Sequence, residues 1–278
     1  MTANTTTSAS PQTSVVLSQT TLLLMATACG LCAGANYFNQ PLLNSMVQHL
    51  HISDAQASST VTMAQVSYGL GLLFLVPLGD MLERRKLVLT LMLLAACGML
   101  LSGISGMTNS FTLLAAGTLM AGVFSVAAQV LVPMAAAFAA PGASGRAVGL
   151  VMSGLLVGIL ASRSVAGILS SLVSWNAVYW VGAIATLLMA VLLARSLPSA
   201  PPTARLGYGQ VMRSMGQLLR QYPRLRSRAL VGGLGFATVS VLFSTMALLL
   251  AGPLHGLNDL QIGLIGIVGI AGALIANM

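Results

Sequence analysis

A set of polar side chains lies inside otherwise apolar segments of this sequence, and their chemistry suits binding better than catalysis. They are Asn36, Asn39, Gln40, Gln65, Tyr68, Gln129 and Arg163. Amides and phenols can hold a neutral ligand by hydrogen bonds, and a guanidinium can hold an anionic group. An enzyme would need a cluster of His, Asp and Glu or a Ser/His set within these segments, and the segments contain none. We therefore expect no enzymatic activity, no metal and no cofactor.

The cysteines and histidines support the same expectation. Cys29 and Cys32 have the spacing of a redox or metal pair, but no second ligand pair accompanies them. Small buried side chains are the better explanation of two cysteines in an apolar segment. The three histidines, at 49, 51 and 255, fall in expected loops and are more simply explained as solvated residues than as ligands.

Arg163 is the charged residue expected deepest within an apolar segment. It follows Arg146 by 17 positions, which is roughly 25 Å along a helix, so it falls in the outer half of a membrane. A buried arginine costs several kcal/mol unless it faces water or a partner, which favours a role in substrate binding or internal pairing. The alternative is a side chain that snorkels to the headgroups.

Gln129 is the most interesting of the amides. Its neighbours in sequence are apolar, so its amide needs a partner. Pro133, four residues later, is expected to loosen the helical hydrogen bonds near it. Substrate contact and a structural hydrogen bond between helices are equally plausible interpretations.

The composition predicts which elements position these side chains. Charged residues make up 6% and apolar residues 56% of the chain, whereas about a quarter of a soluble domain is charged. Repeated apolar runs of about 20 residues match a bilayer, and only helices satisfy their backbone there at this length. The fold class is therefore an all-α polytopic membrane protein. We expect eight spans, at 17–38, 57–78, 87–106, 111–135, 146–170, 176–196, 229–251 and 259–277.

The basic residues predict the orientation of these spans. The net charge is +8, yet eleven of the twelve Lys and Arg residues fall in alternate loops, which argues against a nucleic-acid partner. The positive-inside rule places those loops and both termini in the cytoplasm. We expect a monomer in a bacterial-type inner membrane, with the lipid bilayer and a small-molecule substrate as its partners.

Two similar segments predict an internal repeat. Residues 52–56 (Ile-Ser-Asp-Ala-Gln) and 257–261 (Leu-Asn-Asp-Leu-Gln) each place a helix-start residue before an acid. The expected domains are a disordered cytoplasmic tail (1–16), a six-helix half (17–196), a cytoplasmic linker with an amphipathic helix (197–228) and an incomplete second half of two helices (229–278). On this scheme the chain is a truncated transporter. The alternative is a natural eight-helix protein.

The turn Val76–Lys86 concentrates five of the sixteen charged residues. It resembles the loop between the second and third helices of major facilitator superfamily transporters, whose motif is Gly-x-Leu-Ala-Asp-Arg-x-Gly-Arg-Arg/Lys. Asp80, Arg84 and Arg85 match its acidic and basic positions, while Met81 and Glu83 depart from it. The resemblance implies that Asp80, Arg84 and Arg85 serve as a conformational latch on the cytoplasmic side. The alternative for Arg85 is a role in topology alone.

Other segments resemble the same family less completely. The end of the first span, Tyr37–Leu43, is similar to the drug- and sugar-efflux branch. Gly154 and Gly158 match part of the antiporter signature in the fifth helix, and their spacing favours close helix packing. The family's membrane-embedded arginine in the fourth helix is replaced here by Thr118. The resemblance implies a secondary transporter that exports a small organic molecule by alternating access. The alternative is a non-transporting membrane fragment.

Overall fold

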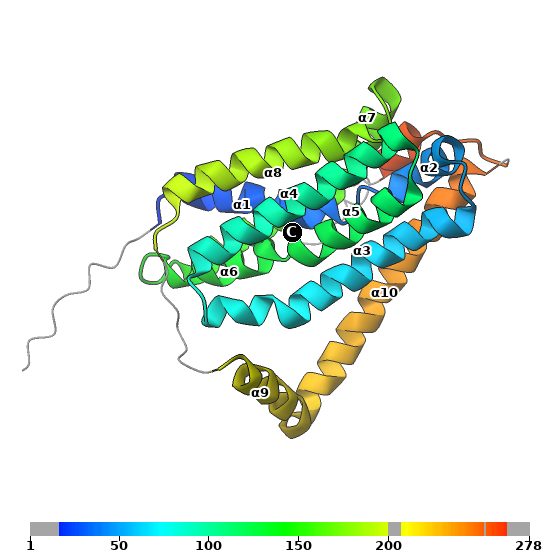
Figure 1. Ribbon diagram of the computed structural model, residues 1–278. Helices are drawn as coiled ribbons and strands as arrows, with labels where there is room; N and C mark the ends of the chain where they lie inside the picture. Colours follow the sequence, from blue (N-terminus) through cyan, green and yellow to red (C-terminus); the bar gives the residue numbers. More distant parts are fainter. Residues whose placement is uncertain (1–16, 200–206, 253, 266–278) are drawn as a thin grey trace, which may run out of the picture.

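The protein is an all-helical bundle in this computed structural model, which describes residues 17–199, 207–252 and 254–265 (Figure 1). No strand occurs among these residues. The helices are α1 (Gln19–Ala35), η1 (Gln40–Leu42), α2 (Leu43–Leu50), α3 (Asp54–Phe74), η2 (Val76–Asp80), α4 (Arg84–Thr108), α5 (Phe111–Phe124), α6 (Ala127–Ala137), α7 (Ser144–Leu172), α8 (Ala177–Ser196), α9 (Tyr208–Gln221) and α10 (Pro223–Ala251).

Seven stretches of the described chain are long and apolar enough to cross a membrane, and they correspond to the first seven expected spans. Of the expected eighth span, only residues 259–265 are described, and they are helical. The rest of that span and the expected tail at 1–16 lie outside the described residues. The expected amphipathic helix of the linker is present as α9.

The expectation that the first span ends at residue 38 and is followed by a loop is wrong. After a short break, the chain continues through η1 and α2 as far as Leu50. Pro41 stands in the first turn of η1, where its missing N–H is tolerated. Leu43, Met46 and Leu50 are buried against the bundle, and burial of this apolar face explains why the segment is helical.

The seventh span also begins earlier than expected, at Pro223 instead of residue 229. Proline at the first helical position is pre-organised for a helix start. The three arginines at 224, 226 and 228 are exposed on its first turns, so the helix can start here without burying a charge. The predicted linker therefore ends as two helices, α9 and the start of α10.

Helices α1 to α8 form one bundle with alternating direction, and glycines allow their closest approach. A Cβ at Gly30 would lie 2.6 Å from the carbonyl oxygen of Gly154, and a Cβ at Gly158 would collide with the backbone of Gly30. Glycine is thus required along the α1–α7 seam. Gly149, on the same helix, has no atom within 4 Å of its Cβ position.

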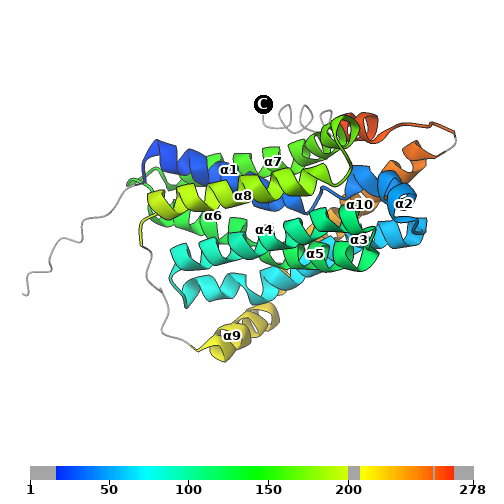
Figure 2. The same ribbon diagram turned by 45° about the horizontal axis from the view of Figure 1, so that its top comes forward.

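The bundle has two ends, which we call the basic end and the opposite end. The basic end contains the turn from η2 to α4 and the ends of α6 and α8. The opposite end contains α2 and the turn after α10. Figure 1 shows α10 approaching the bundle at the opposite end and diverging from it toward the basic end, and both Figure 1 and Figure 2 show α9 at the basic end. Every described side chain from 223 to 238 is exposed, whereas Ala247 is buried.

Candidate functional site

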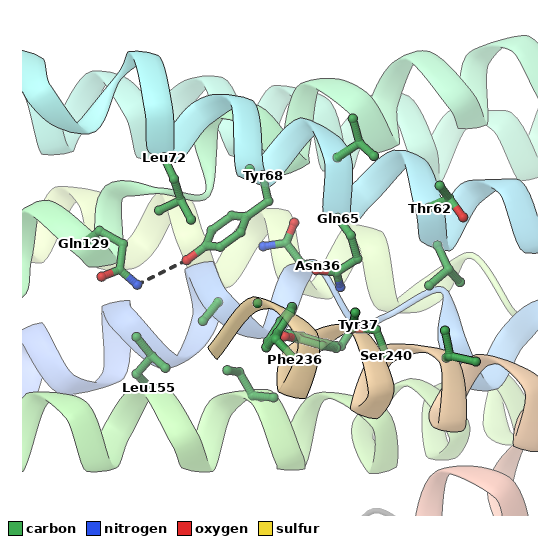
Figure 3. Close-up of a pocket in the computed structure, with 18 of the residues that line it drawn as sticks. Asn36, Tyr37, Thr62, Gln65, Tyr68, Leu72, Gln129, Leu155, Phe236 and Ser240 are labelled. Carbon is green, nitrogen blue, oxygen red and sulfur yellow. Dashed lines mark hydrogen bonds between the residues drawn. The ribbon is translucent and has the colours of Figure 1, made fainter. Parts of the chain in front are cut away.

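A pocket of about 850 Å³ lies between the bundle and α10 (Figure 3). This volume falls in the range of small-molecule sites. Its walls come from the end of α1, one face of α3, single turns of α6 and α7, and the middle of α10. The polar groups at its wall are Asn36, Tyr37, Ser58, Thr62, Gln65, Tyr68, Gln129, Ser240 and Thr245. No Asp, Glu, Lys, Arg or His is among the described residues that line it.

Gln129 and Tyr68 meet across the pocket wall. The Gln129 Nε2 donates a hydrogen bond to the Tyr68 hydroxyl over 3.2 Å, drawn as a dashed line in Figure 3. Gln129 lies in the first turn of α6, just after residues 125–126 interrupt the helix between α5 and α6. Pro133 lies within α6 as expected. The amide is therefore both a helix-to-helix partner and a wall of the pocket.

Asn36 and Gln65 present unpartnered atoms to the pocket. Asn36 caps α1, and its side chain is 5% exposed, yet its Oδ1 has no hydrogen-bond partner among the described residues. The Gln65 Nε2 is equally buried and lies near the Tyr37 hydroxyl without hydrogen-bond geometry. Figure 3 shows all three side chains in one region of the pocket. Unpaired buried polar atoms are costly unless a ligand or water completes them.

Asn39 and Gln40, expected in the substrate pathway, do not line this pocket. The Asn39 Oδ1 accepts a 2.6 Å hydrogen bond from the Tyr179 hydroxyl, and its Nδ2 donates to the Thr118 hydroxyl over 3.4 Å. Both residues are nearly fully buried. The helical continuation through η1 turns them toward α5, α7 and α8, and sequence spacing across an unforeseen break could not give that direction.

Arg163 is buried and paired internally, so the snorkelling alternative is wrong. Its Nε donates to the Gln40 Oε1 over 2.7 Å, and its Nη1 to the carbonyl of Ile159 over 3.4 Å. Its guanidinium lies 4.8 Å from the ring centre of Tyr37 and 4.1 Å from that of Phe243 on α10. Both are cation–π distances. The side chain is thus held between α1 and α10 instead of facing the pocket.

Little space remains around this arginine. The cavity bounded by Gln40, Arg163, Phe243 and Ala247 measures about 10 Å³, at most the room of one water molecule. The pocket is therefore closed on this side by packed side chains.

Asp259 adds a second contact at the opposite end. This acid of the second repeated segment is buried, with 7% of its surface exposed. Its Oδ2 accepts a hydrogen bond from the Ser45 hydroxyl of α2 and one of 2.6 Å from the Ser170 hydroxyl of α7. The Ser164 hydroxyl donates to the carbonyl of Gly263 over 2.9 Å. We call Arg163, Asp259 and their partners the polar clasp.

The charged turn at the basic end pairs within its own half. Asp80 and Arg84 form an ion pair of 3.0 Å, and Arg84 also donates to the carbonyl of Gly79. Arg85 donates to the carbonyl of Ala194 at the end of α8. A hydrogen bond from the Ser199 hydroxyl and the neighbouring Lys86 lower the pKa of Glu83. Helix α9 reaches this turn, since the Tyr208 hydroxyl donates to the carbonyl of Phe74 over 3.0 Å.

Comparison with known proteins identifies the family. Residues 25–278 match the family model of the Major Facilitator Superfamily. The chain belongs to this superfamily. It is 46% identical over 248 residues to "Uncharacterized transporter YgaY" of Escherichia coli, covering 89% of this chain and 62% of that protein. It is 31% identical to a "Probable transporter" of Streptomyces coelicolor, covering 92% of this chain and 59% of the relative.

A solved structure supports the same fold. The crystal structure of a D-xylose-proton symporter superposes with a TM-score of 0.60 at 17% identity, covering 93% of this chain and 68% of that one. At this identity the likeness concerns the major facilitator fold alone. The chain spans about three fifths of the length of the curated relatives that it matches.

Sequence patterns missed part of the site. Tyr37, Thr62, Phe236 and Ser240 line the pocket, but aromatic and hydroxyl side chains are too common in apolar helices to be singled out. The segment of Asp259 repeats that of Asp54, but the repeat does not indicate burial, because Asp54 is exposed and Asp259 is buried. In both segments the cap is reciprocal: Ser53 pairs with Gln56, and Asn258 with Gln261.

Proposed function

We propose that this chain forms the substrate pocket of a secondary transporter that exports a small organic molecule by alternating access. The observation that carries the proposal is the pocket of about 850 Å³, which is lined both by the bundle and by α10. A substrate site at the interface between two halves is what an alternating-access transporter requires. The family membership and the relatives named as transporters support it.

On this proposal residues 17–196 form the N-terminal half, and α10 begins the second half. The basic end faces the cytoplasm of a bacterial-type inner membrane with both termini on that side, because loops rich in Lys and Arg are retained there. The present state is then inward-facing, with the polar clasp as the outer closure. The chain acts as a monomer, and its substrate enters the pocket from the cytoplasmic side.

Asp80, Arg84 and Arg85 are proposed to latch the basic end in the alternate state. The Asp80 side chain is 57% exposed, so its carboxylate can accept a further partner in the alternate state. Closure there would exchange a solvated ion pair for a contact between the halves. The resemblance to the drug- and sugar-efflux branch supports a small amphipathic or sugar-like substrate.

A flux measurement tests this function. Inverted membrane vesicles containing the transporter are energised, and uptake of radiolabelled phenyl glucoside, an uncharged amphipathic sugar derivative, is followed with time. We expect saturable uptake above that of vesicles without the protein. Absence of uptake for this probe and for a panel of uncharged amphipaths would contradict the proposal.

The same measurement decides the second candidate, a membrane fragment that inserts without transporting. The observation that favours it is that the chain spans 62% of its first relative. Comparison of this chain alone with the longest reading frame that contains it separates the two. Uptake only by the longer frame would assign the pocket to this chain and the alternation to both parts together.

A further inference from the structure

The polar atoms of the pocket are distributed unevenly, and this distribution indicates which chemical group the pocket takes. Toward the basic end, Gln129 and Tyr68 already satisfy each other. Toward the polar clasp, one buried acceptor and one buried donor lack a hydrogen-bond partner among the described residues, namely the Asn36 Oδ1 and the Gln65 Nε2. Both are buried at the wall of the same cavity (Figure 3).

A bound group that meets both atoms must donate to Asn36 and accept from Gln65. A hydroxyl or a primary amide does both, while an ammonium has no acceptor and a carboxylate has no donor. The Tyr37 hydroxyl, close to Gln65, can serve such a group in either role. The three residues thus define a subsite for a neutral group that donates and accepts.

The surrounding charges argue against an ion in this subsite. No charged side chain is among the described residues of the pocket wall. The guanidinium of Arg163 lies 4.8 Å from the Tyr37 ring, so it disfavours a cation here, and its hydrogen bond to Gln40 and its contact with Phe243 leave it outside the pocket wall. A buried ion without a paired charge or several hydrogen bonds is strongly disfavoured.

Apolar side chains line the remainder of the cavity. Leu72 of α3, Leu155 and Ile159 of α7 and Phe236 of α10 face it. Burial of an apolar ligand body against them contributes roughly 25 cal/mol for each Å². One end of the ligand is therefore matched by amides and the rest by hydrocarbon.

We propose that Asn36, Gln65 and Tyr37 form a head-group subsite that selects uncharged amphipathic molecules bearing a hydroxyl or amide group. This inference rests on the proposed function only in taking the cavity as the substrate pocket. It assigns the polar head to the end beside the polar clasp and the apolar body to α7 and α10.

Protection of a single cysteine tests the subsite in the full chain. The variant Thr62→Cys, made without the native cysteines, places a thiol on the pocket wall one helical turn before Gln65. Labelling by a maleimide is timed in nanodiscs with four compounds of matched size: phenylbutanol, phenylbutanamide, phenylbutanoate and phenylbutylammonium. Butylbenzene, which lacks the head group, is the fifth. We expect the alcohol and the amide to protect the cysteine from labelling at concentrations about tenfold lower than those that the carboxylate and the ammonium compound require.

Removing the open atoms should remove this preference. Asn36→Leu or Gln65→Leu should weaken protection by the alcohol and the amide about tenfold, the ratio equivalent to one net hydrogen bond. Protection by butylbenzene should be unchanged, which shows that the pocket is still folded. Gln48→Leu, the same kind of change at an exposed position of α2, should alter neither.

The outcomes separate this inference from the function on which it rests. Equal or tighter protection by an ion, or unchanged protection by the alcohol in both leucine variants, would overturn the subsite. No protection by any compound, butylbenzene included, would overturn the pocket itself. Protection as expected without flux in vesicles would leave the subsite in place and contradict transport.

Discussion

The two ends of this molecule treat their polar groups in opposite ways. At the opposite end, Arg163 and Asp259 are buried and bridge separate parts of the chain, from α1 and α2 to α10 and the segment after it. At the basic end, Asp80 and Arg84 pair with each other four residues apart. The difference shows that a high density of charged residues does not indicate where the bundle and α10 are in contact. The end with few charges is closed, and the end with many is open.

The energetics explain this contrast. Hydrogen bonds and cation–π contacts of a buried charge are strengthened by the low dielectric around them. An exposed ion pair on one helical turn contributes a few tenths of a kcal/mol. The polar clasp can therefore hold the two halves together. The charged turn can do the same only when its side chains bind a partner on a helix of the other half.

The largest predicted effect is that of Arg163→Ala, which breaks the clasp. Among the contacts of Arg163 described above, the cation–π contact with Phe243 is the one that reaches α10, so we expect opening to become easier by about 2 kcal/mol, roughly thirtyfold in the equilibrium. The measurement is the labelling rate of Thr62→Cys by an impermeant maleimide added on the opposite side. Transport should also be lost while expression is retained. Arg195→Ala, an exposed arginine at the end of α8, is the control, and equal rates in both variants would contradict the clasp.

The next effect is that of Asp259→Asn, which keeps the size of the side chain. An amide accepts more weakly than a carboxylate from Ser45 and Ser170. We therefore expect opening to become easier by about 1.5 kcal/mol, which raises the labelling rate of Thr62→Cys roughly tenfold. Asp54→Asn is a matched control, because Asp54 occupies the equivalent position of the repeat and is exposed. A larger effect at Asp54 than at Asp259 would remove the distinction between the two copies.

A third change tests the seam that supports both ends. Gly158→Leu forces a side chain into the backbone of Gly30 and should lower the free energy of unfolding by about 1–3 kcal/mol or prevent insertion. Gly149→Leu has open space and should change it little. Thermal unfolding in detergent measures both. Similar melting temperatures for the two variants would argue against close packing of α1 and α7.

The smallest predicted effect is that of Asp80→Asn at the basic end. In the present state it breaks one exposed ion pair, worth no more than about 0.5 kcal/mol, so sided labelling of Thr62→Cys should stay within twofold of the parent. The transport rate should nevertheless fall if Asp80 latches the alternate state. Lys86→Gln is the control for charge alone. Unchanged flux in Asp80→Asn would remove the latch from the account.

Much of this contrast was predictable from the sequence, and the rest depended on geometry. Apolar runs predicted the seven described stretches that are long enough to cross a membrane, because span length and composition report directly on a bilayer. Asn36, Gln65, Tyr68 and Gln129, expected in the substrate pathway, line one cavity, and their role there stays a prediction. Asn39 and Gln40, expected in the same pathway, do not line that cavity, because the helix continues past the break beside them.

Two features of the clasp had no local signal. The partner of Arg163 on α10, Phe243, is 80 residues away in sequence, and a phenylalanine in an apolar helix has nothing to distinguish it. The burial of Asp259 depends on hydroxyls from α2 and α7 that face it. Pattern and propensity describe one helix at a time, whereas both of these contacts join separate helices.

The most direct test of the account is the side from which the pocket is reached. Single cysteines replace Thr62 in the pocket and Ser214 on α9, in separate copies of the chain, and an impermeant maleimide is added to one face of the membrane at a time. The account predicts that both positions react from the same face, the cytoplasmic one, and that neither reacts from the other. Labelling of the Thr62→Cys variant from the face opposite to Ser214→Cys would contradict the closure of that end by the polar clasp.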